Sequence, residues 1–137
     1  GVRLGYCLCS DTELLARMRA AGQPWAVSSL AQAAGIAALD ETEYVAKVRA
    51  LIEAQRPVLA DGLRALGLRV IEGRVNYLLF RAPEALGEAL RRKGAVLRSC
   101  GNYPGLDASW YRTAVRTENE NRQLLALLAE TLPEVAQ

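Results

Sequence analysis

Histidine is missing from this sequence of 137 residues, and its absence excludes several classes of enzyme site. A Ser-His-Asp or Cys-His nucleophile system needs an imidazole as its general base. Neither system can be assembled from this chain alone. If the chain takes part in catalysis, the chemistry has to come from a cofactor, a partner or additional sequence.

Cysteine is scarce as well, with Cys7, Cys9 and Cys100 as its three occurrences. An odd number is not a disulfide framework. Cys7 and Cys9 share one face of an expected strand, which could suggest a pair of soft metal ligands. A structural zinc site needs two further cysteine or histidine ligands, so we expect no metal site. We interpret the three cysteines as small hydrophobic residues in a reducing compartment.

Charge of one sign and long apolar runs are also lacking. The 17 basic and 15 acidic residues give a net charge of +2, and the few aromatic residues (6%) are not interleaved with basic ones. This balance does not favour a nucleic-acid partner. No apolar run reaches the ~18 residues of a membrane-spanning helix, and the strand-like start at Gly1 does not look like a signal peptide. We therefore expect a cytoplasmic protein without a membrane partner.

What is present is enough hydrophobic sequence, 51%, for a sizeable core. The first part reads as a strand over Val2–Cys9, a helix that starts with a capping box at Ser10–Glu13 and runs up to Gly22, and an alanine-rich helix over Ser28–Leu39. A long helix follows from Asp40, with apolar residues at intervals of three and four. We expect Pro57 to kink or divide this helix.

Beyond the helix C-cap at Gly67, short strands alternate with helices. This order predicts an α/β (α+β) fold, in which helices pack on a short mixed or antiparallel sheet. The expected domain boundary lies near Leu39, which gives two parts, residues 1–39 and residues 40–137.

The stretch from Tyr111 to Asn121 is the most informative for function. Tyr111, Thr113 and Val115 alternate with Arg112, Ala114 and Arg116, which predicts a strand with different faces. Both arginines then lie on one face of the expected strand. Thr117 and Glu120 form a capping box that starts the last helix, which we expect to run to Pro133. This arrangement suggests an anion site, although a solvated basic strand edge is the simpler alternative.

Five motifs in a fixed order make the whole chain resemble the C-terminal part of the class I/II aminotransferase-fold enzymes, which use pyridoxal phosphate (PLP). They are Gly1-Val2-Arg3-Leu4-Gly5-Tyr6, Gln23-Pro24-Trp25-Ala26-Val27-Ser28, Arg74-Val75-Asn76-Tyr77-Leu78-Leu79, Leu97-Arg98-Ser99-Cys100 and Tyr111-Arg112-Thr113-Ala114-Val115-Arg116. The resemblance implies the small C-terminal domain of a fold-type I PLP-dependent enzyme. Residues 1–39 would then be the end of the large PLP-binding domain and the interdomain linker.

The resemblance also implies roles for individual residues. Arg3 looks like the ligand of the cofactor phosphate, and the matching Schiff-base lysine would precede Gly1. Arg112 falls on the arginine that binds the substrate carboxylate, and Arg98 and Asn76 fall on motifs near the substrate. Asn76 could instead satisfy backbone groups at a strand edge, and Arg98 could be a surface arginine. We expect a fragment that is inactive alone, from a parent enzyme that is a homodimer.

Within this family the likeness is greatest to the threonine-phosphate decarboxylases of cobalamin biosynthesis, which are lyases. The histidinol-phosphate aminotransferases, their near relatives, typically have glycine where this chain has Arg116. Arg116 would add a contact to a phosphorylated amino-acid substrate, unless it only pairs with Glu118 or Glu120. Ser99 stands where aspartate is usual, which weakens any role at that position. An aminotransferase and a non-catalytic α/β interaction module remain the alternatives.

Overall fold

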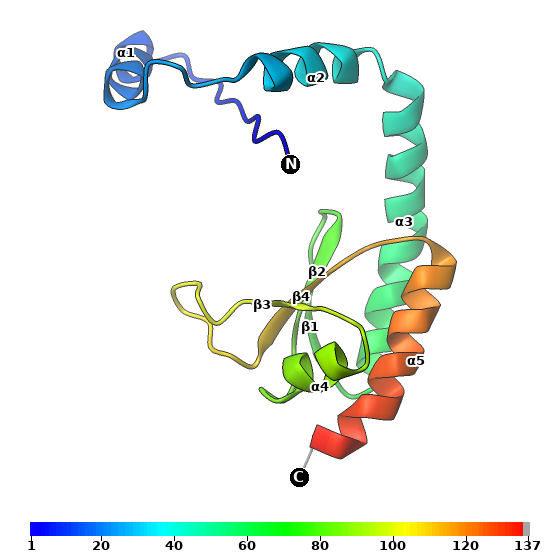
Figure 1. The fold of residues 1–137 in the computed structure, drawn as a ribbon. Coiled ribbons are helices and arrows are strands. Elements are labelled where there is room, and N and C mark those ends of the chain that lie inside the picture. Colours follow the sequence, from blue (N-terminus) through cyan, green and yellow to red (C-terminus); the bar gives the residue numbers. More distant parts are fainter. Residues whose placement is uncertain (136–137) are drawn as a thin grey trace. The chain divides into compact units, whose positions relative to one another are not determined.

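The computed structural model describes residues 1–135. Its elements, in chain order (Figure 1), are α1 (Thr12–Ala21), α2 (Ser29–Leu39), α3 (Thr42–Ala65), β1 (Arg69–Ile71), β2 (Tyr77–Arg81), α4 (Leu86–Arg92), β3 (Arg98–Ser99), β4 (Trp110–Ala114) and α5 (Glu118–Val135). None of these helices is both long and apolar enough to cross a bilayer. Residues 1–135 also contain no group of three or more histidine, cysteine or carboxylate side chains that could hold a metal ion.

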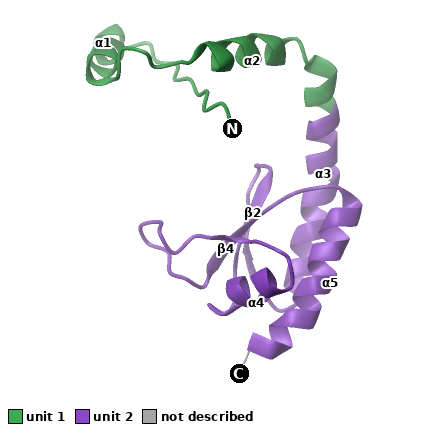
Figure 2. Cartoon of the chain, viewed as in Figure 1, with its two compact units in different colours: residues 1–46 green, residues 47–137 purple. Residues whose placement is uncertain are grey.

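The chain divides into two compact units, Gly1–Ala46 and Lys47–Gln137, and the division falls inside α3 (Figure 2). The assignment of residues 1–39 to a large domain and of residues 40–137 to a small one stays a prediction. α3 is continuous through Pro57, so the proline does not divide the helix. Gly67 ends this segment with a φ of 77°, a conformation that glycine adopts without a Cβ clash.

In the first unit, local capping sets both helices. The Asp11 carboxylate accepts a hydrogen bond from the Leu14 N–H at 2.9 Å, and the Ser28 hydroxyl accepts one from the Ala31 N–H. The strand expected over Val2–Cys9 is wrong, because these residues form no strand. A strand is stable only beside a hydrogen-bonded neighbour, and no other described segment pairs with this one.

The second unit is a four-stranded antiparallel sheet in the order β1-β2-β4-β3, with helices on one face. The core is made by side chains from α3, β2, α4, β4 and α5, namely Leu59, Leu63, Leu78, Phe80, Leu86, Leu90, Tyr111 and Leu128. Each large apolar side chain buried in this way contributes about 1.5–3 kcal/mol. α3 and α5 lie side by side (Figure 1), and a Cβ on Gly62 would come within 2.4 Å of a Leu125 methyl group.

Candidate functional site

β4 lies in the middle of the sheet and presents Arg112. Tyr111 and Thr113 are buried on the helix-covered face, whereas Arg112 and Ala114 belong to the opposite face. The predicted alternation of Tyr111–Ala114 is therefore confirmed. Pairing with β2 on one side and β3 on the other fixes the Arg112 backbone, so that its side chain starts from a rigid position.

Arg98 stands directly opposite Arg112 in the antiparallel pairing of β3 with β4. Directly opposed residues have Cα atoms roughly 4.5–5.5 Å apart and point to the same face. Two like charges at such positions are destabilising. Neither arginine forms an ion pair with a carboxylate within residues 1–135. The two positive charges are therefore left available to an anionic ligand.

Each guanidinium of this pair instead lies near a tyrosine ring. The Arg112 ζ carbon is 4.6 Å from the centroid of the Tyr77 ring. The Arg98 ζ carbon is 5.9 Å from the Tyr103 centroid, and Arg98 donates a hydrogen bond of 3.4 Å to the Asn102 side chain. Sequence reasoning missed both tyrosines as site residues. The contact of Tyr77 depends on cross-strand register, which the sequence does not display.

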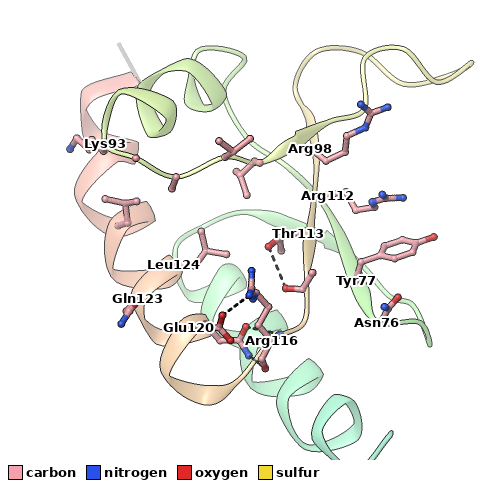
Figure 3. Close-up of a pocket in the computed structure, with 17 residues that line it drawn as sticks. Asn76, Tyr77, Lys93, Arg98, Arg112, Thr113, Arg116, Glu120, Gln123 and Leu124 are labelled. Carbon is pink, nitrogen blue, oxygen red and sulfur yellow. Dashed lines mark hydrogen bonds and ion pairs between the residues drawn. The ribbon is translucent and has the colours of Figure 1, made fainter. Parts of the chain in front are cut away.

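Arg116 lies outside β4, which ends at Ala114 and not at Arg116 as predicted. Figure 3 shows Arg112 and Arg98 on one side of β4, with Tyr77, and Arg116 on the other side, beside Glu120. The prediction of one shared strand face is therefore wrong, because the strand periodicity stops before Arg116. Both arginines nevertheless line one open groove of about 690 Å³.

Asn121 is a third residue that the sequence did not single out. Its side-chain oxygen accepts a hydrogen bond from the Arg116 N–H at 3.1 Å, and its amide donates to the Arg116 carbonyl at 2.9 Å. The same amide donates to the Gln55 side chain at 3.3 Å. Asn121 is buried. Its two hydrogen bonds to the Arg116 backbone fix the segment that leads from β4 into α5.

Glu120 holds the Arg116 side chain through an ion pair of 2.6 Å. Hydrogen bonds from Thr117 lower the pKa of the Glu120 carboxyl below its ordinary value, and the Arg116 charge lowers it further. The Thr117 N–H donates to this carboxylate at 3.2 Å and the Thr117 hydroxyl at 2.6 Å, so the half of the predicted capping box that Glu120 provides is confirmed. Of the two partners considered for Arg116, the structure selects Glu120; Glu118 pairs with Arg122.

Comparison with known proteins identifies the family. The family described as "Aminotransferase class I and II" matches residues 1–128. The chain belongs to this family. Threonine-phosphate decarboxylase of Salmonella typhimurium is 38% identical over 140 residues, covering 99% of this chain and 38% of that protein. Histidinol-phosphate aminotransferase of Symbiobacterium thermophilum is 37% identical over 137 residues, covering 98% of this chain and 37% of that protein.

The solved structure of histidinol-phosphate aminotransferase from Clostridium acetobutylicum superposes with a TM-score of 0.76 at 29% identity. The superposed region covers 89% of this chain and 38% of the Clostridium chain. The predicted fold class is thus confirmed. The present chain spans about 38% of the length of the Salmonella threonine-phosphate decarboxylase. These relatives are PLP-dependent enzymes.

Arg3 is the residue that the sequence predicts as the ligand of the cofactor phosphate. It is exposed, has a φ of 60°, and forms no ion pair with a carboxylate of the described residues. An arginine fork without an acidic partner fits a phosphate group. Arg3 belongs to the first compact unit, and the groove to the second.

Asn76 borders the groove at the start of β2. Its carbonyl accepts a hydrogen bond from the Val115 N–H at 2.9 Å, so its backbone extends the β2–β4 pairing. Its side-chain amide is exposed and makes no hydrogen bond with residues 1–135. The backbone thus has the structural role, and the amide is free to meet a ligand.

Lys93, at the C-terminal end of α4, lines the groove as well. Its ammonium group donates to Glu130 at 2.8 Å and to Glu134 at 2.7 Å. Hydrogen bonds to these two carboxylates raise the pKa of Lys93 above its ordinary value. A lysine that stays protonated is a poor amine nucleophile.

Proposed function

We propose that this chain provides the substrate-binding face of a PLP-dependent enzyme that decarboxylates a phosphorylated amino acid. The observation that supports this proposal is the pair of opposed arginines, Arg98 and Arg112, which have no acidic partner among residues 1–135. L-Threonine O-3-phosphate is the substrate class that fits best, since it presents a carboxylate and a phosphate close together.

Two anionic groups on one small substrate need two cationic forks. In this proposal Arg112 binds the carboxylate, in agreement with its position in the family pattern, and Arg98 binds the phosphate. Guanidinium groups form two parallel hydrogen bonds with either anion, which a lysine cannot do. The side-chain amide of Asn76 adds a polar contact at the rim of the groove.

Arg116 favours the decarboxylase over the aminotransferase, because the aminotransferase relatives typically have glycine at this position. Its ion pair with Glu120 is exposed, with 65% and 39% of the two side chains accessible. Exposed ion pairs contribute about 0–1 kcal/mol. Arg116 can therefore exchange Glu120 for an anionic substrate at little cost, and so help to set the orientation of that substrate.

Arg3 would hold the phosphate of PLP, which supplies an electron sink when it is bound. The residues of this chain contribute binding and orientation. By fixing the substrate carboxylate, Arg112 helps to determine which bond of the substrate is aligned for cleavage. The two lysines of the chain, Lys47 and Lys93, are not proposed as Schiff-base residues, and the chain alone is proposed to be inactive. That the complete enzyme is a homodimer stays a prediction.

The test is the Arg116→Gly substitution in the complete enzyme that contains these residues. L-Threonine O-3-phosphate is supplied, and carbon dioxide release and amino transfer are both measured. Loss of one charge-assisted contact should lower kcat/KM for decarboxylation roughly 10- to 150-fold. Arg122→Ala is the matched control, since it removes an exposed ion pair of the same spacing outside the groove. Unchanged decarboxylation in Arg116→Gly would return Arg116 to a structural role.

A histidinol-phosphate aminotransferase is the second candidate. The 37% identity to that enzyme of Symbiobacterium thermophilum and the TM-score of 0.76 with the Clostridium structure favour it. The same assay separates the two candidates. Efficient amino transfer from histidinol phosphate by the wild type, without carbon dioxide release from threonine phosphate, would select the aminotransferase.

A further inference from the structure

The contact between Tyr77 and Arg112 follows from the sheet register. Tyr77 on β2 stands opposite Ala114 on β4, so it is diagonal to Arg112, two residues earlier on β4. Long and aromatic side chains reach across such a diagonal. The small side chain of Ala114 leaves space beside the ring, and the Arg112 ζ carbon lies 4.6 Å from the ring centroid. This distance is within the range of a cation–π interaction.

A tyrosine ring differs from a carboxylate as a partner for arginine. A carboxylate would hold the guanidinium but would also neutralise its charge. The face of an aromatic ring attracts a cation through its quadrupole and carries no net charge. A ring therefore restricts the arginine and leaves its charge and its N–H donors for a ligand.

We propose that Tyr77 is a positioning residue, which holds the Arg112 guanidinium ready for the carboxylate of the substrate. Tyr103 has the same relation to Arg98 across the loop after β3. This inference rests on the proposed function, because it assumes that the arginine pair binds an anionic substrate. Restricting a long side chain before binding lowers the entropy that binding costs. Tyr77 thus raises affinity without a contact of its own to the substrate.

The first test needs no ligand and uses the 137-residue chain. The side-chain protons of Arg112 are assigned by NMR in the wild type and in Tyr77→Leu, Tyr77→Phe and Tyr44→Leu. Tyr77 is 38% exposed, so neither substitution empties the core, and circular dichroism verifies folding. Tyr44 is a matched control. It is an exposed tyrosine on α3, and within residues 1–135 its ring makes no cation–π contact with an arginine.

We expect the ring-current shift of the Arg112 Hδ protons to disappear in Tyr77→Leu and to persist in Tyr77→Phe and Tyr44→Leu. A phenylalanine ring preserves the cation–π contact, so its rescue distinguishes the ring from the hydroxyl. Equal Arg112 shifts in the wild type and in Tyr77→Leu would overturn the inference.

The second test titrates each variant with L-threonine O-3-phosphate and follows the Arg112 signals. Tyr77→Leu should bind roughly 2- to 5-fold more weakly, as expected for one exposed cation–π contact. Tyr77→Phe should stay within about twofold of the wild type, and Tyr103→Leu should disturb Arg98 but not Arg112. Equal affinity in the wild type and Tyr77→Leu would also overturn the inference. If the Arg112 signals of the wild type do not change when L-threonine O-3-phosphate is added, the proposed function fails. The ring-current comparison then still decides whether Tyr77 holds Arg112.

Discussion

The Tyr111 hydroxyl should be a measurable source of stability, because it joins β4 to the start of α4. Tyr111 is 2% exposed, and its hydroxyl donates to the Glu84 carbonyl at 2.6 Å and accepts from the Gly87 N–H at 3.2 Å. Its ring stacks on Phe80 with centroids 6.0 Å apart. The Tyr111→Phe substitution removes the hydroxyl and preserves the ring contact.

Two hydrogen bonds of this kind contribute about 1 kcal/mol each. The expected loss is therefore about 2 kcal/mol in the free energy of unfolding. In a folded unit of this size, that loss lowers Tm by roughly 8–16 °C. Urea denaturation should show a lower midpoint with an unchanged m-value, since the surface exposed on unfolding is the same.

Tyr44→Phe is the control, because it removes a hydroxyl from an exposed tyrosine of α3 and should change stability little. Tyr111→Leu should cost more than Tyr111→Phe, since it also removes the ring from the Phe80 contact. A Tyr111→Phe variant with the wild-type midpoint would refute the reasoning. In that case water would replace the hydroxyl without loss.

Three further predictions concern charge, chemistry and association. Because the folded state lowers the pKa of Glu120, this group stabilises fully above its unfolded pKa and less as pH falls through the lowered value. Thr117→Ala should therefore lose less stability than the wild type between about pH 5 and pH 3, measured by urea denaturation. Incubation of the 137-residue chain with PLP and borohydride should leave Lys47 and Lys93 without an adduct by mass spectrometry, and a modified lysine would contradict the proposed inactivity. Deleting the residues before Asp40 should reduce self-association, because many large apolar side chains there are exposed, and a monomer of the whole chain by sedimentation would count against this.

Local signals were sufficient to predict the helices. Ser28 begins α2 and Thr117 with Glu120 begins α5, because capping depends on side chains three residues apart. The antiparallel pairing of β1 and β2 also follows from two short apolar runs around Gly73. Where the signal is contained within a few residues, the sequence is adequate.

Non-local pairing could not be predicted in the same way. Val2–Cys9 has the composition of a strand, but no described segment pairs with it. Arg98 and Arg112 could each be singled out, whereas their opposition across β3 and β4 requires the register. For the same reason, the sequence did not assign Tyr77 to Arg112. The strand predicted from the alternation ended at Arg116, beyond the observed end at Ala114. The alternation does not show where hydrogen bonding to the neighbouring strand ends.

The length of the loop between β3 and β4 sets the register that places Arg98 opposite Arg112. Successive side chains of a strand point to opposite faces of the sheet. A shift of one residue in the register would therefore turn Arg98 toward the helices. β3 has two residues, and the register is continued by the Cys100 N–H, which donates to the Trp110 carbonyl at 2.8 Å. A Cβ on Gly101 would come within 3.2 Å of the Ala108 backbone, so the loop closes tightly on itself. One insertion or deletion in this loop would therefore shift the register and separate the two charges that face each other.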